Sequence, residues 1–239
     1  MTGPLHDQTV LVVGRGGGTA RAITVAARDA GAQVVAAGRD RRTLAAVYAG
    51  EPGITTETVD LTDEASIAAL GRRLGTVGHV VSTASAQARG RIADLDRDAI
   101  MLSFYTEVVG PFMLAKHLAP RMPASGSFVL FSGVAAAKIT VGTLGVAITN
   151  GAADVLARSL ALELAPIRVN AISPGVIDTG AWDALGKQGK ADYVADMSAR
   201  NPARRIGTAD DIANGVLFAM TSPFLTGVTL HIDGGEPLT

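Results

Sequence analysis

Short apolar segments alternate with longer amphipathic segments along most of the chain. The short segments are rich in β-branched residues, as in Thr9–Val13 (TVLVV), and such runs are typical of strands that are buried on both faces of a sheet. This pattern predicts strands at residues 9–13, 33–37, 55–59, 77–82, 127–132, 167–172 and 228–232. It predicts helices at residues 19–30, 63–74, 96–121, 144–164 and 210–221.

The alternation of strands and helices favours one fold class. Strand–helix–strand units form right-handed crossovers between parallel strands. We therefore expect an α/β fold, a Rossmann-like doubly wound parallel sheet of about seven strands with helices on both faces. No linker or internal repeat divides the 239 residues, so residues 1–239 are expected to form a single domain. Residues 182–201 give only weak helical signals, which Gly186 and Gly189 interrupt.

A glycine-rich turn joins the first predicted strand to the first predicted helix. Glycines let a ligand approach the backbone closely, and N–H groups at a helix N-terminus bind anions such as a pyrophosphate. The position of the turn, after a buried strand and before a helix, favours a dinucleotide site over a simple tight loop. The residues expected to bind the dinucleotide here are Gly14, Arg15, Gly16, Gly17, Gly18 and Thr19.

The end of the second predicted strand distinguishes between the two nicotinamide cofactors. An NAD site usually has an acidic residue here that binds the ribose 2′-hydroxyl, whereas this chain has Gly38 and Arg39. An arginine can bind a 2′-phosphate with paired donors, and Arg15 and Arg41 add positive charge nearby. We therefore expect NADP (NADPH) rather than NAD. The alternative interpretation is that Arg39 is an ordinary surface residue.

Further motifs resemble those of the short-chain dehydrogenase/reductase family, in the family's order and over nearly the whole chain. The glycine turn resembles the family's TGxxxGxG, although Val13 and Ala20 replace its first and last residues. The other matching segments are Asp60-Leu61-Thr62, Asn170 to Gly175, Arg205-Ile206-Gly207 with Asp210 to Ala213, and Asp233-Gly234-Gly235. The resemblance implies further cofactor contacts from Asp60, Leu61, Ser82, Thr83, Ala84, Pro174, Gly175, Val176, Ile177 and Thr179.

At four positions the sequence differs from the residues that the family uses for catalysis. The family uses an Asn, a Ser and a Tyr-x-x-x-Lys pair for catalysis, and the matching residues here are Glu107, Gly133, Val146 and Asn150. Valine has no proton to give, and asparagine has no charge that would lower a neighbouring pKa. The candidate catalytic residues at or beside these positions are therefore Glu107, Ser132 and Asn150.

Glu107 has two interpretations at this point. As a carboxylate beside a partly apolar pocket, it is a candidate acid or base. Alternatively, it hydrogen-bonds Asn150 across the two long helices. Tyr193, in the segment from 177 to 202 that is expected to cover the substrate, is a less favoured replacement for the missing tyrosine. In that segment Trp182, Leu185, Tyr193 and Met197 predict an apolar wall.

Three functions are compatible with these residues. The first is an NADP(H)-dependent oxidoreductase that acts on a carbonyl, alcohol or enone with a non-standard proton donor, because hydride transfer is the cofactor's own chemistry. The second is a catalytically inactive NADP(H)-binding sensor or partner subunit. The third is a non-redox enzyme, such as a dehydratase or cyclase, that uses Glu107 as its base.

The composition bears on three further questions: the partners, metal sites and membrane segments of the protein. The net charge of -1 gives no reason to expect nucleic acid or an anionic membrane surface as a partner. The chain has no cysteine, and its four histidines are widely spaced, so no metal site is expected. The sequence has no signal pattern and no continuous apolar run of membrane-spanning length. We expect a cytoplasmic protein with a small-molecule substrate, a homodimer or homotetramer formed through the helices at 96–121 and 144–164.

Overall fold

A computed structural model describes residues 3–239. Its centre is a seven-stranded parallel sheet with the strand order β3-β2-β1-β4-β5-β6-β9. The fold class predicted from the sequence, a doubly wound α/β sheet, is confirmed. The strands of this sheet are β1 (Thr9–Val13), β2 (Gln33–Gly38), β3 (Ile54–Thr58), β4 (His79–Ser82), β5 (Ser127–Phe131), β6 (Arg168–Pro174) and β9 (Thr229–Ile232).

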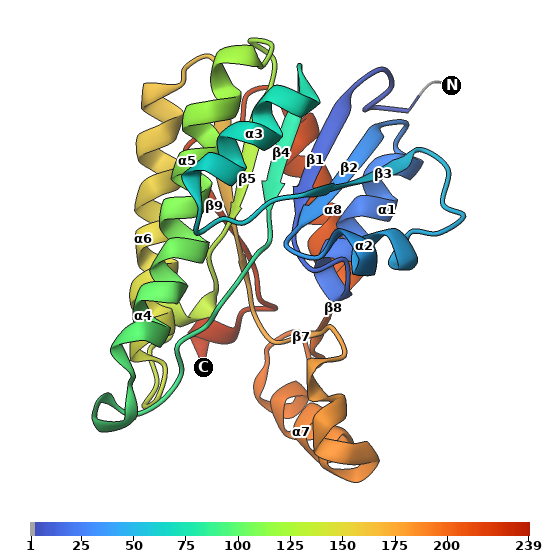
Figure 1. Ribbon diagram of the computed structural model, residues 1–239. Helices are drawn as coiled ribbons and strands as arrows, with labels where there is room; N and C mark the ends of the chain where they lie inside the picture. The colour runs from blue at the N-terminus through green and yellow to red at the C-terminus, as the bar shows by residue number, and fades with distance from the viewer. Residues whose placement is uncertain (1–2) are drawn as a thin grey trace.

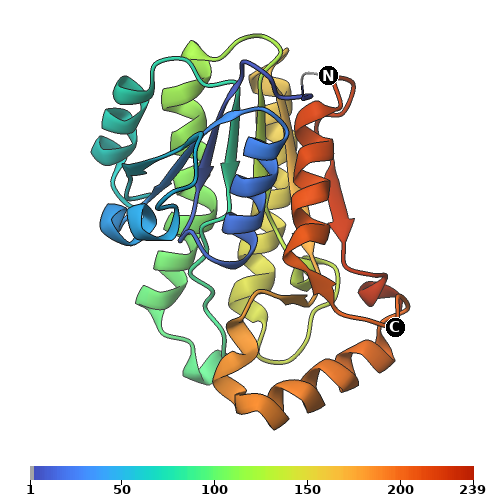
Figure 2. The ribbon, with the colours of Figure 1, turned by 90° about the vertical axis from the view of Figure 1, so that its right-hand side faces the viewer.

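Helices cover both faces of the sheet, as Figures 1 and 2 show. On one face, α1 (Gly18–Asp29) packs against α8 (Ala209–Thr221). The other face carries α3 (Glu64–Leu74), α4 (Arg97–Phe104), α5 (Gly110–Leu118) and α6 (Leu144–Glu163). Each layer has its own apolar core, because the central strands are buried on both sides and project side chains alternately into the two layers.

The structure differs from the predicted elements in four places. A short helix, α2 (Arg41–Val47), follows β2, where the side chain of Asp40 accepts hydrogen bonds from the first turn. The helix predicted at 96–121 contains a π-helical turn, Tyr105–Val109, between α4 and α5. A two-stranded ribbon of β7 (Ile177–Asp178) and β8 (Gly207–Thr208) leaves the main sheet. Between them α7 (Gly186–Arg200) is one continuous helix despite Gly189.

One helical run has the length and composition that a membrane span requires. Within residues 3–239, the helical run Arg97–Arg121, 25 residues long, is apolar enough to cross a membrane by length and composition alone. Core helices of soluble proteins pass the same test. In this run Leu114, Ala115 and Leu118 are buried in the core beneath α5.

A buried polar cluster lies at the opposite end of the sheet from the glycine turn. His79, 2% exposed, begins β4 and bonds Ser127 Oγ through Nδ1 at 2.7 Å and Gln8 Oε1 through Nε2 at 2.6 Å. Burial, with a smaller contribution from the charge of Arg168, lowers the pKa of His79 to about 4. The folded protein therefore holds His79 neutral where an unfolded chain would already be protonated.

This cluster predicts a loss of stability in mild acid. Between pH of about 6.5, the ordinary histidine pKa, and about 4, only the unfolded chain binds the proton. The stabilisation is fully present above this window, and the free energy of unfolding should fall by up to about 3 kcal/mol across it. Urea denaturation at several pH values measures the effect. The His79→Gln variant should show a flatter profile, whereas replacing the half-exposed His231 with Gln should leave the profile unchanged.

Candidate active site

The glycine turn forms a cradle at the N-terminus of α1. No side chain caps this helix, so its first N–H groups are free to bind an anion. A Cβ atom at Gly14 would lie 2.3 Å from Thr83 Oγ1, and one at Gly18 would lie 2.9 Å from Thr179 Cβ. Gly18 also has a φ of +49°, a conformation that side chains disfavour. The glycines are therefore required where the turn passes between the β4 end and the segment after β7.

Two exposed arginines flank this cradle. Neither Arg15 nor Arg39 makes a side-chain hydrogen bond or ion pair within residues 3–239, whereas Arg41 donates to the Thr56 carbonyl at 3.1 Å. Hydrogen bonds from Thr62 lower the pKa of Asp60, and the nearby charge of Arg39 lowers it further. Arg39 and Asp60 thus lie together at the edge of the sheet that the turn occupies. Arg39 is free to bind a phosphate there.

The predicted contacts from β3 and β4 are only partly available to a ligand. Leu61 is 6% exposed and packs in the core, where a Cβ at Gly110 would lie 2.7 Å from its own Cβ, so its side chain is not free to touch a cofactor. Ser82 is also buried, and its hydroxyl has no partner among the described residues. Thr83 donates its hydroxyl to the Val13 carbonyl at 2.9 Å. Ala84 is half-buried beside it.

The segment after β6 closes the cradle from the other side. Pro174, Gly175, Val176 and Thr179 are half-buried, and Ile177 is buried in the core. The Val176 N–H donates to the Glu236 carboxylate at 3.3 Å, which ties this segment to the C-terminal turn. The carboxyl end of the sheet is therefore lined by Asp60, the glycine turn and Thr179. The side chains of Leu61 and Ile177 pack in the core, so only their backbone is available to a ligand.

Glu107 occupies the π-helical turn and is 7% exposed. Its Oε1 accepts hydrogen bonds from the Ala86 N–H at 2.9 Å, the Ser85 hydroxyl at 3.1 Å and the Ser103 hydroxyl at 3.3 Å. The interpretation that Glu107 bonds Asn150 is wrong for this structure, because the loop after β4 supplies the partners instead. π-Helical turns often occur at functional sites.

Asn150 and Gly133 fit together as a pair. A Cβ at Gly133 would lie only 2.6 Å from Asn150 Nδ2, so the amide fills the space that a side chain at 133 would need. Asn150 is 4% exposed, and its carbonyl accepts the hydroxyl hydrogen of Ser132 at 3.0 Å. Val146, one turn earlier on α6, is 1% exposed and packs with Ala135 and Ala147. Gly133 and Ser132 directly follow β5, and neither they nor Val146 and Asn150 offer an acidic proton.

This pairing predicts the effect of a single methyl group. Gly133→Ala should lower the free energy of unfolding by about 1–3 kcal/mol, because the buried Asn150 amide must move aside. Adding Asn150→Ala should recover most of that loss in a double-mutant cycle. Gly151→Ala, on the same helix with no atom within 4 Å of its Cβ position, is the matched control and should not destabilise. An unchanged stability of Gly133→Ala would show that the amide does not fill this space.

The segment expected to cover the substrate projects away from the sheet as a lid (Figure 1). Tyr193 of α7 stacks on Trp182 with ring centroids 4.4 Å apart, and the Trp182 indole N–H donates to the Ile177 carbonyl at 3.4 Å. Of the predicted apolar wall, Leu185 is 52% exposed and contributes little burial. Tyr193 thus packs against Trp182 within the lid.

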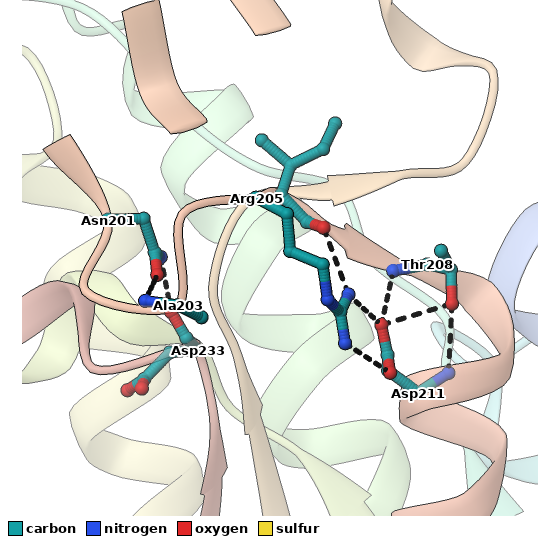
Figure 3. A network of polar contacts seen from close by, with 7 residues as sticks. Asn201, Ala203, Arg205, Thr208, Asp211 and Asp233 are labelled. Carbon is teal, nitrogen blue, oxygen red and sulfur yellow. Dashed lines mark hydrogen bonds and ion pairs between the residues drawn. The ribbon is translucent and has the colours of Figure 1, made fainter. Parts of the chain in front are cut away.

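A polar network anchors the return of the lid to the sheet (Figure 3). Arg205 holds Asp211 with two hydrogen bonds, at 2.5 and 2.8 Å, and this pairing keeps the pKa of Asp211 well below its usual range. Asp211 also completes a capping box with Thr208 at the start of α8. Asn201 bonds the carbonyl of Asp233 at 2.7 Å. The C-terminal motifs found in the sequence therefore stabilise the segment that joins the lid to the sheet.

Sequence reasoning missed the residues that hold Glu107. Ser103 lies one helical turn before it, a spacing that the sequence does display. Ser85 and Ala86 are 22 and 21 residues away, and only the fold brings them to the carboxylate. Within residues 3–239 the structure has no group of His, Cys, Asp and Glu side chains that could hold a metal ion.

Comparison with known protein families gives one match over most of the chain. The sequence model described as "Enoyl-(Acyl carrier protein) reductase" matches residues 14–236. L-xylulose reductase from Mesocricetus auratus is 31% identical over 245 residues, which cover 98% of each chain. Carbonyl reductase (NADPH) 2 from Sus scrofa is 30% identical over 235 residues, which cover 94% of each chain.

Solved structures extend the likeness to the whole fold. MalC Reductase/Diels-Alderase from Malbranchea aurantiaca superimposes with a TM-score of 0.92 at 25% identity, covering 99% of this chain and 98% of that one. A small-chain dehydrogenase in complex with NADPH gives a TM-score of 0.81 at 28% identity, covering 98% of this chain and 100% of that one. The similarity therefore includes the lid as well as the sheet.

Proposed function

Because the chain belongs to the short-chain dehydrogenase/reductase family, a family of NAD(P)-dependent oxidoreductases, we propose that it is an NADP(H)-dependent oxidoreductase with a non-standard proton source. The observation that carries the proposal is the cradle of Gly14, Gly16 and Gly18 at an uncapped helix N-terminus, with the unengaged Arg39 beside it. The first N–H groups of α1 have no side-chain partner, which leaves them available to the pyrophosphate of a dinucleotide.

The residues fit the cofactor at both ends. The N–H groups of the glycine turn would hold the pyrophosphate, and Arg39 would hold the 2′-phosphate. Thr179 and the backbone of Pro174 to Val176 would face the nicotinamide end. When bound, the nicotinamide supplies or accepts a hydride. Two comparison proteins carry NADPH in their printed names, which supports NADPH over NADH here.

The chain's own part in proton transfer falls to Glu107 or to water. Glu107 is the one ionisable side chain among the four positions that the family uses for catalysis. Losing a positioned general acid usually costs about 10²–10⁴-fold in rate, which slows an enzyme without abolishing its chemistry. The substrate therefore has to tolerate weak acid assistance, as enones and quinones do better than simple ketones.

Activity with NADPH tests the proposal. Pure protein is mixed with NADPH and a panel of aldehydes, ketones, quinones and enones, and NADPH oxidation is followed at 340 nm by absorbance, a wavelength specific to the reduced cofactor. We expect oxidation above background with the more electrophilic members. Binding of NADPH with no oxidation by any member would contradict a carbonyl, quinone or enone substrate. The lack of both binding and oxidation would contradict the proposal.

One observation favours a second candidate function. The solved neighbour from Malbranchea aurantiaca is named both a reductase and a Diels-Alderase, so its name joins a reduction to a cyclisation. A cyclisation in this chain would use the same cleft, with Glu107 as a base or a positioning group. An NADPH-independent change of a substrate, lost in Glu107→Gln, would support this candidate.

We also propose that the chain forms a homodimer or homotetramer through the helical run 97–118 and α6. These two elements leave large apolar side chains exposed to solvent. They are Met101, Leu102, Tyr105, Phe112, Leu144, Ile148, Val155 and Leu162. Light scattering should give a mass that is a multiple of 24.4 kDa, and Phe112→Glu with Ile148→Glu should lower it toward that value. A mass of 24.4 kDa at all concentrations would contradict this part of the proposal.

A further inference from the structure

Glu107 is a buried carboxylate without a counter-ion. None of the ion pairs found among residues 3–239 includes it, although its side chain is more than nine-tenths buried. Among the described residues, all three of its hydrogen bonds end on Oε1. Oε2 accepts none, and it is not one of the fully buried atoms that lack a partner. This oxygen therefore remains accessible from outside the protein, to water or to a ligand.

The carboxylate lies at the end of the sheet where the chemistry is expected. Ser85 and Ala86, which bind it, directly follow β4, and the π-helical turn that carries it packs against α6, the helix of Asn150. Two donors from this loop and the Ser103 hydroxyl of α4 hold Oε1. Oε2 is the carboxylate oxygen that remains open to a ligand.

The groups beside it do not supply a proton. Val146 is apolar and buried, Gly133 has no side chain, and Ser132 already donates its hydroxyl hydrogen to the Asn150 carbonyl. A carbonyl substrate would become an alkoxide on receiving hydride. That product needs a proton at once, and its negative charge would lie near Glu107, where like charges repel each other.

We propose that the site takes a cationic hydride acceptor, an iminium ion, with Glu107 as its counter-ion; this rests on the proposed NADP(H)-dependent hydride transfer. The iminium carbon receives the hydride and its two electrons, the C=N π pair becomes the nitrogen lone pair, and the nitrogen loses its charge. NADPH becomes NADP⁺, so one positive charge remains in the cleft throughout. No proton moves. An iminium substrate thus explains both the carboxylate of Glu107 and the lack of an acidic residue that could donate a proton.

The lid adds a surface that suits such a ligand. The stacked rings of Trp182 and Tyr193 offer aromatic faces, which attract cations by about 0.5–2 kcal/mol. The cation that acts on Tyr193 is Arg89, which is exposed and donates to Gln87 at 3.0 Å. Among the described residues, Arg89 makes no ion pair with Glu107.

Binding of a matched pair of probes tests the inference without relying on turnover. The cationic probe is N-methyl-3,4-dihydroisoquinolinium, and the neutral one is 1-tetralone, a ketone with a similar fused frame. Calorimetry is done on protein saturated with 1,4,5,6-tetrahydro-NADP, which cannot give hydride. We expect the cation to bind at least about tenfold more tightly than the ketone, from one pairing with a partly buried carboxylate.

Variants then assign the preference to Glu107. Glu107→Gln should lose most of the affinity for the cation while its affinities for 1-tetralone and NADPH stay unchanged. Glu163→Gln makes the same chemical change on the exposed end of α6 and should behave as wild type. With NADPH in place of the analogue, the iminium probe should be reduced and the ketone should not.

Three other outcomes would count against the inference in different ways. Equal affinity of wild-type protein for the two probes, with NADPH bound, would overturn the iminium assignment and leave the proposed oxidoreductase intact. A cation preference that survives in Glu107→Gln would overturn the role of Glu107. If NADPH does not bind, the proposed function fails and the inference fails with it. The wild-type comparison needs no variant, so the test holds even if Glu107→Gln does not fold.

Discussion

Replacing Arg39 with alanine should lower the affinity for NADPH by about 10–100-fold and leave the affinity for NADH nearly unchanged. The estimate follows from the loss of charge-assisted, paired hydrogen bonds to the 2′-phosphate, worth about 1.5–3 kcal/mol. Arg39 is exposed and has no partner among the described residues, so its removal should not disturb the fold. Calorimetric titration with both cofactors measures the two affinities.

The control for this experiment is a second exposed arginine far from the turn. Arg72 on α3 is suitable, and Arg72→Ala should bind NADPH like the wild type. A parallel loss of NADH affinity in Arg39→Ala would show that Arg39 stabilises the glycine turn and does not bind the 2′-phosphate. Unchanged NADPH affinity would make Arg39 an ordinary surface residue and remove the argument for NADP(H).

Replacing Gly18 with valine should abolish measurable binding of every nicotinamide dinucleotide, a loss of at least about 100-fold. A β-branched residue strongly disfavours a φ of +49°. Its Cβ would also lie 2.9 Å from Thr179 Cβ and 3.1 Å from the Thr179 carbonyl oxygen. The turn would have to move, which takes the first N–H groups of α1 away from the pyrophosphate position.

The neighbouring glycine provides a close control. Gly17 has a φ of -113°, and no atom lies within 4 Å of its Cβ position. The cofactor affinity of Gly17→Ala should therefore stay within a few-fold of the wild-type value. Gly17→Ala and Gly18→Val should both keep the circular dichroism spectrum of the wild type. Normal cofactor binding by Gly18→Val would mean that the turn is not the pyrophosphate site.

Local patterns were sufficient for the sheet because its five central strands, β2, β1, β4, β5 and β6, are largely buried. A buried strand needs a short apolar run, and the predicted strands agree with the observed ones to within two residues. The helix α7 gave only a weak signal in the sequence, because it is polar and has no buried residues. Its glycines therefore argued against a continuous helix. The Asp40 cap of α2 was present in the sequence as an N-terminal signal and was overlooked.

The candidate site was predictable only where its chemistry lies in consecutive residues. The glycine turn and Arg39 are of this kind. The environment of Glu107 depends on a π-helical turn, which the sequence analysis did not predict, and on a loop that follows a different strand. The fit of Asn150 against Gly133 joins two elements 17 residues apart and depends on the distance between them, which no residue pattern encodes.

The central proposal is that the glycine turn and Arg39 form an NADP(H) cradle. Calorimetric titration of the wild-type protein with NADPH, NADP⁺, NADH and NAD⁺ tests it most directly. We predict that all four titrations fit one site and that the phosphorylated cofactors bind at least about tenfold more tightly, as one phosphate–arginine contact implies. Binding of none of the four, by protein shown to be folded, would contradict it.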